Sequence, residues 1–306
     1  MEFLITPLKY EFVVNGMIVA MMIGILCGII GIYVVLRGMS YIGHGLSHAA
    51  FGGAVIGYIF SINLYIAAGV WGLLSAFLIN LIVREKKIKA DAAIGIVTTA
   101  SFALGIALIS RIRRFTKNLE AILFGNILGV TTEDIIIIGI VTLLVIIIIF
   151  FLYKQLLFVT FDPESANVYG TRASLIDAIF SFILAASIIV SLQVIGVTLI
   201  AAAIIIPAST ARLLTNNFNK MFFLSIAIGA ITSVAGIYAS FYLNAASGAT
   251  IVLLGALIFS IVLIYNYIHR KIMLHEHAHS HLHGAIPHHH THLDDAEHSH
   301  EHKEKV

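Results

Sequence analysis

The sequence is short of charged residues. Only 11% of its 306 residues are Asp, Glu, Lys or Arg, against about 25% in soluble domains. Hydrophobic residues make up 59% of the chain, and the mean hydropathy is +1.00. This composition excludes an ordinary soluble domain. It also excludes disorder over most of the chain, because so much apolar surface drives burial.

Cysteine and proline are scarce as well. The single cysteine, Cys27, excludes a disulfide scaffold or a cysteine-based zinc fold, and we interpret it as a small buried apolar side chain. Four prolines exclude a proline-rich chain. No G-x-x-x-x-G-K-[ST] sequence occurs, and no nucleophile–histidine–acid set stands out. We therefore do not expect the chain itself to be an enzyme that hydrolyses ATP or peptides.

Long apolar runs are what the sequence has in abundance. A transmembrane helix needs about 20 apolar residues. A run at 194–206 is short, and it is either a ninth span or half of a tight helical hairpin. The sequence thus predicts an all-α polytopic membrane protein with eight or nine transmembrane helices and a retained first span. The longer runs cover residues 12–36, 41–62, 63–83, 92–110, 133–153, 174–190, 221–243 and 249–268.

Basic residues in the loops predict the orientation in the membrane. Segments 84–91, 154–172 and 212–220, and the end of the last run, carry Lys or Arg, and they fall on one side if 174–190 and 194–206 each cross the membrane. The positive-inside rule makes that side cytoplasmic, together with the C-terminus. The basic segment 111–117 falls on the opposite side and disagrees with the rule. The basic residues form no continuous stripe, so no nucleic-acid partner is expected.

Small residues recur at a spacing of four, which lets helix backbones approach closely. This pattern predicts a tight helical bundle and says nothing about what is transported. The pairs are Gly24 and Gly28, Gly53 and Gly57, and Gly125 and Gly129.

The last 32 residues differ from the rest, so we divide the chain into a transmembrane domain at 1–274 and a disordered cytoplasmic tail at 275–306. The tail has twelve of the fifteen histidines and no aromatic residue. Imidazoles at every second position or closer can chelate a divalent ion; a merely solubilising tail is the alternative. The candidate ligands are His275, His277, His279, His281, His283, His288, His289, His290 and His292.

Two further histidines lie inside an apolar run. His44 and His48 are four residues apart, so a helix places them on one face. Neutral imidazole is an inexpensive polar group in a membrane and a good ligand for Zn²⁺. Two ligands do not close a tetrahedral site, but a twofold partner would supply two more. The alternative is that each histidine hydrogen-bonds to a neighbouring helix.

Four segments together resemble the permease subunits of zinc/manganese/iron-type ABC transporters. The resemblance covers about residues 10–268, and its most specific segment is SLQVIGVTLIAAAIIIPASTARLLT. The others are RGMSYIGHGLSHAAFGG, LEAILFGNILGV and FDPESANVYG. It implies an ABC importer permease bundle with short re-entrant or coupling helices, embedded as a homodimer in the cytoplasmic membrane of a bacterium or archaeon. It also implies a separate ATPase subunit, an extracellular metal-binding protein and no permanently bound cofactor.

The resemblance implies roles for two polar segments that, from their residues alone, are either solvated loops or docking helices. The segment from Pro207 to Asn217 is similar to the helix that couples such permeases to their ATPase, and 161–170 is expected nearby. The coupling residues so implied are Pro207, Ala208, Ser209, Ala211, Arg212, Leu213, Leu214, Asp162 and Glu164.

One position departs from the family pattern, which often has Asp where this chain has His44. Four neutral imidazoles would leave the charge of the ion uncompensated and would shift preference from Mn²⁺ toward Zn²⁺. We therefore expect an importer of divalent transition metal ions, and we favour zinc over manganese or iron as its substrate. The alternatives are an ATPase-independent secondary metal transporter and an ABC permease for a metal chelate.

Overall fold

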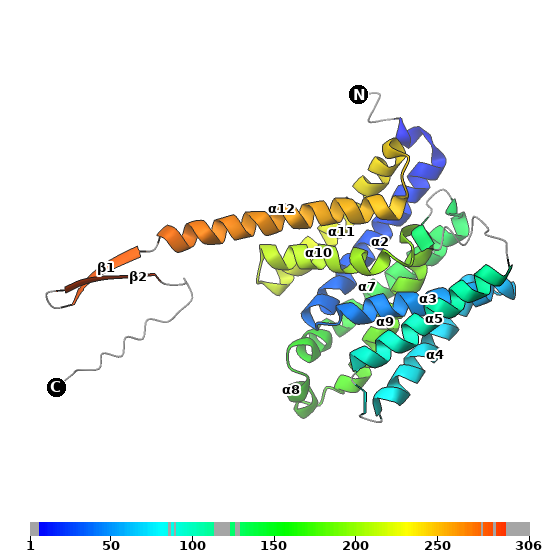
Figure 1. Ribbon diagram of the computed structural model, residues 1–306, viewed down its shortest axis with the longest axis horizontal. Coiled ribbons are helices and arrows are strands. Elements are labelled where there is room, and N and C mark those ends of the chain that lie inside the picture. The colour runs from blue at the N-terminus through cyan, green and yellow to red at the C-terminus, as the bar shows by residue number, and fades with distance from the viewer. Residues whose placement is uncertain are drawn as a thin grey trace. The chain divides into compact units, whose positions relative to one another are not determined.

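A computed structural model describes residues 6–84, 87–88, 90–112, 123–125, 129–276, 278–283 and 286–291 (Figure 1). The chain divides into two compact units, Met1–Phe259 and Ser260–Val306. Most of the basic segment 111–117 lies outside the described residues, and so do His277 and His292.

The described part of the first unit is helical, which confirms the all-α fold expected for the membrane domain. Helix α12 begins in the first unit and ends in the second. The elements are η1 (Pro7–Lys9), α2 (Glu11–Leu36), α3 (Ser40–Ile59), α4 (Leu64–Arg84), α5 (Ala90–Ile112), α7 (Thr132–Phe161), α8 (Pro163–Val168), α9 (Ala173–Ile195), α10 (Ile200–Leu214), α11 (Phe218–Leu243) and α12 (Ser247–Glu276).

Six helices among the described residues are long and apolar enough to cross a membrane: α2, α5, α7, α9, α11 and α12. Shorter apolar helical stretches cover Leu64–Ile79 and Ile200–Leu214. The count of eight or nine spans is therefore not confirmed. Helix α10 has 15 residues, about 22 Å at 1.5 Å per residue, against a hydrocarbon core of about 30 Å. In α3, serines, glycines and the two histidines dilute the apolar residues.

The second unit contains two short strands where the sequence predicted no regular structure. Strand β1 (Ala278–His283) pairs antiparallel with β2 (Ile286–Thr291). The residues of β1 alternate between histidine and smaller or apolar types, which is the two-residue period of a strand. Residues 292–306 lie outside the described part of the chain.

Glycine brings α2 and α11 into direct backbone contact. A methyl group at Gly24 would overlap the carbonyl of Gly229, and one at Gly28 would lie 2.6 Å from the Ser225 carbonyl oxygen. The Ser225 hydroxyl donates a hydrogen bond of 2.7 Å to the carbonyl of Gly28. The close packing predicted from the spacing of Gly24 and Gly28 is thus confirmed.

The other two glycine pairs behave differently from each other. Gly53 and Gly57 in α3 face α4, where added methyl groups would come within 2.9 Å of Ala67 or Trp71 atoms, as the sequence predicted. Gly125 is not helical and has a φ of +78°. It allows a turn that passes close to the end of α9, so the spacing of Gly125 and Gly129 does not mark a helix–helix contact.

Aromatic contacts show which helix ends lie together. Helices α2 and α11 run antiparallel, because the ring centroid of Tyr33 lies 5.9 Å from that of Phe218, and the ring centroid of Tyr10 lies 5.7 Å from that of Phe241. Phe161, at the end of α7, lies 6.5 Å from Phe218. We call this the α8 end: the C-terminal ends of α2 and α7, helix α8, and the N-terminal ends of α9 and α11. The two basic segments 154–172 and 212–220 share it, as predicted from their charge.

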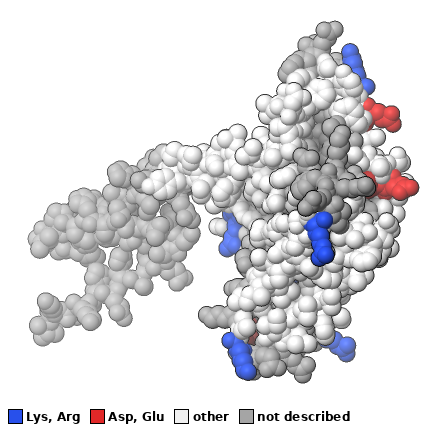
Figure 2. All heavy atoms as spheres, turned by 45° about the vertical axis from the view of Figure 1, so that its right-hand side comes forward, with Lys and Arg blue, Asp and Glu red and all other residues white. Residues whose placement is uncertain are grey.

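The outer surface of the first unit is apolar. Large side chains such as Phe77, Phe150 and Leu253 are exposed in the middle of long helices. Charged side chains are few on the face shown in Figure 2, and they lie scattered rather than gathered into one patch. Such a surface fits a lipid environment and would be unusual for a soluble protein.

Candidate functional site

Helix α3 brings His44 and His48 together. Their Nε2 atoms lie 3.0 Å apart, within hydrogen-bonding distance, and their ring centroids are 4.4 Å apart. The ring of His48 also packs edge-to-face on Phe102 of α5, with centroids 4.5 Å apart. Its Nδ1 atom is buried and has no hydrogen-bond partner among the described residues. Nε2 is therefore the nitrogen of His48 that is available to a ligand.

This separation suits metal binding. Tetrahedral Zn²⁺ with Zn–N bonds of about 2.0–2.1 Å places two nitrogen ligands about 3.3 Å apart. The observed 3.0 Å between the Nε2 atoms needs only a small side-chain adjustment to reach it. Without metal, one Nε2 donates to the other. This hydrogen bond lies within α3, whereas the alternative placed the partner of each histidine on a neighbouring helix.

The pair is an incomplete metal site within one chain. Within the part of the chain that the structure describes, no group of three or more His, Cys, Asp or Glu side chains is placed to hold an ion. His44 is exposed, whereas His48 is half-buried against α5. The open side of the pair therefore lies at His44, the residue that departs from the family pattern.

The segment that begins at Pro207 does not form a separate short helix of the kind that the resemblance implied. Pro207 lies inside α10, and with Ala208 and Ala211 it is buried. Ala208 packs on α2, where its Cβ would lie 3.2 Å from a methyl group at Gly31. An apolar membrane helix tolerates an internal proline when neighbouring helices surround it, so the helix continues through Pro207.

Only part of this predicted coupling segment is accessible. Ser209 and Leu213 are half-buried, and Thr210 is buried with its hydroxyl bonded to the carbonyl of Ile206. Arg212 and Leu214 are exposed at the end of α10. These two residues are the ones from Pro207–Leu214 that a partner protein could contact without unfolding the helix.

Helix α8 holds the other two predicted coupling residues at the surface. Asp162 caps the helix by accepting a hydrogen bond of 2.9 Å from the backbone N–H of Ser165, and Pro163 fills the first helical position. Hydrogen bonding from Ser165 holds the pKa of the Asp162 carboxyl below its ordinary value. Glu164 is exposed in the first turn, where a negative charge complements the helix dipole.

Sequence reasoning missed the apolar part of this surface. Val168 is 84% exposed and Tyr169 is 80% exposed, and Phe161 at the start of the segment is 64% exposed. The Asn167 side chain fixes the helix, because its amide donates to the Pro163 carbonyl at 3.1 Å and its oxygen accepts from Ala173 N–H at 3.0 Å. Apolar residues in an otherwise polar, turn-rich segment were the available signal for this patch.

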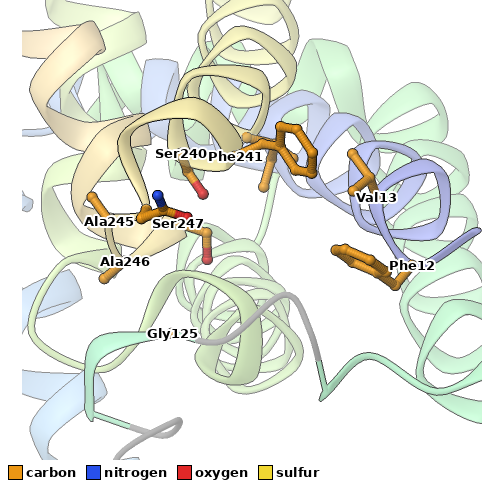
Figure 3. Close-up of a pocket in the computed structure, with 10 residues that line it drawn as sticks. Phe12, Val13, Gly125, Ser240, Phe241, Ala245, Ala246 and Ser247 are labelled. Atoms are coloured by element: carbon orange, nitrogen blue, oxygen red, sulfur yellow. The ribbon is translucent and has the colours of Figure 1, made fainter. Parts of the chain in front are cut away.

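A cavity of about 460 Å³ opens at the other end of the bundle (Figure 3). The described residues that line it include no ionisable side chain. The lining residues are Phe12, Val13, Gly125, Ile237, Ser240, Phe241, Asn244, Ala245, Ala246 and Ser247.

The tail histidines that the structure describes fall on three elements. His275 is in the last turn of α12. His279, His281 and His283 are in β1, and His288, His289 and His290 are in β2. The backbone register places His279 opposite His290, and His281 opposite His288.

Comparison with known proteins identifies the family. Residues 9–266 match the model of the ABC 3 transport family. The chain belongs to the ABC 3 transport family. The match confirms the resemblance seen in the four sequence segments, and it ends before the histidine-rich tail.

Named relatives of this ABC 3 family chain transport manganese or iron. It is 38% identical over 265 residues to the manganese transport system membrane protein MntC of Listeria monocytogenes, covering 87% of this chain and 94% of the relative. It is 34% identical over 259 residues to the chelated iron transport system membrane protein YfeC of Yersinia pestis, covering 85% and 88%. The expected preference for zinc gains no support from these names.

A solved structure shows the same fold. PsaBC from Streptococcus pneumoniae, in complex with Fab, matches with a TM-score of 0.80 and 37% identity, covering 85% of this chain and 94% of that chain. The helices of the ABC 3 family chain are therefore arranged as they are in that solved structure.

Proposed function

We propose that this chain is the membrane permease of an ATP-driven importer of divalent transition metal ions. The observation that carries the proposal is the pair of Nε2 atoms 3.0 Å apart in α3, within a chain of a transport family whose named relatives carry manganese and iron. ATP hydrolysis belongs to a separate subunit, because the sequence has no phosphate-binding loop. A metal-binding protein outside the cell would deliver the ion.

Two copies of the chain complete the metal path. Each contributes His44 and His48, and a twofold axis beside the open side of the pair gives four imidazoles around one ion. An all-imidazole set favours Zn²⁺ over the harder Mn²⁺. The names of the relatives favour manganese or iron. Uptake measurements with each ion decide which metal is transported.

Helix α8 is the docking surface for the ATPase. It is short, exposed and fixed to α9 through Asn167, and it presents Val168 and Tyr169 outward. Arg212 and Leu214 at the end of α10 extend this surface as a secondary contact. The α8 end is accordingly the cytoplasmic end, in agreement with its basic segments.

The tail acts as a second, cytoplasmic metal-binding segment. In β1 and β2 the positions of His279, His281, His283, His288 and His290 share one face, because opposite residues and residues two apart lie on the same side of a hairpin. Five imidazole-bearing positions on one face include a suitable ligand set for Zn²⁺ or Cu²⁺.

Uptake by the reconstituted complex tests the proposed function. The permease, its ATPase and its binding protein would be placed in vesicles, and ATP-dependent accumulation of Zn²⁺, Mn²⁺ and Fe²⁺ would be compared. Uptake that requires both ATP and the ATPase supports an importer. Uptake without the ATPase would instead identify a secondary transporter and overturn the proposal.

A further inference from the structure

Helix α2 ends in a tight turn that leads directly to the helix of the histidine pair. Gly38 adopts a left-handed conformation with a φ of +66°, and the N–H of Met39 donates to the carbonyl of Val34 at 2.9 Å. This is the hydrogen-bond pattern of a glycine-terminated helix. Arg37 caps the helix immediately before this turn, and His44 follows seven residues later.

The guanidinium of Arg37 joins three helices. Its Nε donates to the Thr160 hydroxyl at 2.9 Å, and its Nη1 donates to the Asp177 carboxylate at 2.6 Å. Its Cζ lies 4.6 Å from the centre of the Phe180 ring. Thr160 precedes α8 and Asp177 follows it, so both flanks of the α8 segment meet at this one side chain.

The contacts of Arg37 are energetically important because its side chain is buried. The Arg37 side chain is only 8% exposed, whereas that of Asp177 is 52% exposed. An exposed ion pair contributes little, but an enclosed cation that loses its anion is strongly disfavoured. The Nη2 of Arg37 is buried and has no hydrogen-bond partner among the described residues. Separating the guanidinium from the Asp177 carboxylate is therefore unfavourable in free energy. Arg37 consequently moves with Asp177 when α9 moves.

We propose that Arg37 is a positioning residue that transmits displacement of α8 to α3 and thereby to His44 and His48. A push on α8 moves the end of α7 and the start of α9, which hold Thr160 and Asp177. The rigid fork of the guanidinium passes that movement to the end of α2. The glycine turn at Gly38 then lets α3 move with it. This inference rests on the proposed function, because it takes α8 as the ATPase contact.

The test is the number of ATP molecules hydrolysed per metal ion imported by the full complex in vesicles. Asp177→Asn and Arg37→Gln are expected to raise that ratio about tenfold, the size of a typical coupling between sites, while basal hydrolysis is retained. Asp177→Asn is also expected to lower the melting temperature, because it leaves the enclosed guanidinium without its anion. Arg172→Gln is the matched control, because it removes a cation from the N-terminal cap of α9 and leaves Asp177 in place. It is expected to leave the ratio unchanged.

The outcomes separate this inference from a purely structural role. An unchanged ratio in both variants overturns it, and so does a parallel loss of uptake and hydrolysis with a lower melting temperature. If Arg37→Gln fails to assemble, Thr160→Val removes one of the two hydrogen bonds and should raise the ratio by a smaller factor; no rise overturns the inference. Absence of ATP-dependent uptake in the wild type would instead overturn the proposed function.

Discussion

The Nε2 atoms of His44 and His48 face each other at 3.0 Å on one side of α3. Both are neutral ligands, so the charge of a bound ion is not compensated within the pair. We expect His44→Asp to supply a hard, anionic ligand and to shift transport toward Mn²⁺. A tenfold change in the Mn²⁺:Zn²⁺ uptake ratio corresponds to about 1.4 kcal/mol, a modest effect for a change of ligand charge.

His44→Gln is the control for that substitution, because it removes the imidazole without adding charge. Competition between Mn²⁺ and Zn²⁺ during vesicle uptake measures the ratio directly. If His44→Asp leaves the ratio as in the wild type, residue 44 does not determine the selectivity between Mn²⁺ and Zn²⁺. The zinc preference would then have been inferred from the wrong residue.

Helix α8 offers a second test through its exposed apolar residues. Val168→Asp should weaken ATPase binding by about tenfold or more, since an apolar anchor at the centre of an interface contributes about 2 kcal/mol or more. Arg212→Glu, at the end of α10, should have a smaller effect. Co-purification and coupled ATPase activity measure both. A stronger effect of Arg212→Glu would place the main docking surface at α10, as the sequence first implied.

The contact between α2 and α11 predicts how the bundle responds to added volume. Gly24→Val forces side-chain atoms into the Gly229 carbonyl and should lower the free energy of unfolding by about 1–3 kcal/mol. Gly69→Ala is the control, because the nearest atom to its added methyl is 4.0 Å away. Thermal unfolding in detergent compares the two. Equal melting temperatures would show that the close approach at Gly24 is not required.

The tail makes a separate prediction about metal binding by the full-length protein. His281→Ala/His288→Ala removes two positions that are directly opposite in the hairpin. His289→Ala/His300→Ala removes the same number of imidazoles but leaves the shared face intact. Calorimetric titration with Zn²⁺ should show loss of the tightest site in the first variant only. Equal losses would mean that the tail binds metal by local histidine density rather than by a defined face.

Periodicity and composition were enough to predict the main features of the fold. The apolar runs predicted the helices, and the spacing of four predicted that His44 and His48 share one helix face. Both predictions depend on local sequence alone. Gly24 and Gly28 were predicted to pack closely for the same reason. These features need no knowledge of which helices become neighbours.

Features that depend on tertiary context could not be predicted in this way. The resemblance implied a coupling helix from Pro207 to Asn217, yet α10 continues through Pro207 because surrounding helices bury that turn. Gly125 was grouped with helix-packing glycines, although its positive φ belongs to a turn. The contact of Arg37 with Asp177 joins residues 140 positions apart, and no local pattern links them.

The most direct measurement is metal uptake by the His48→Ala permease in the assembled complex, with Phe102→Leu as a control that alters the neighbouring ring and keeps both imidazoles. We predict that His48→Ala assembles normally and imports neither Zn²⁺, Mn²⁺ nor Fe²⁺ in the presence of ATP, while Phe102→Leu retains uptake. Wild-type uptake by an assembled His48→Ala complex would contradict the assignment of the metal path to the histidine pair of α3.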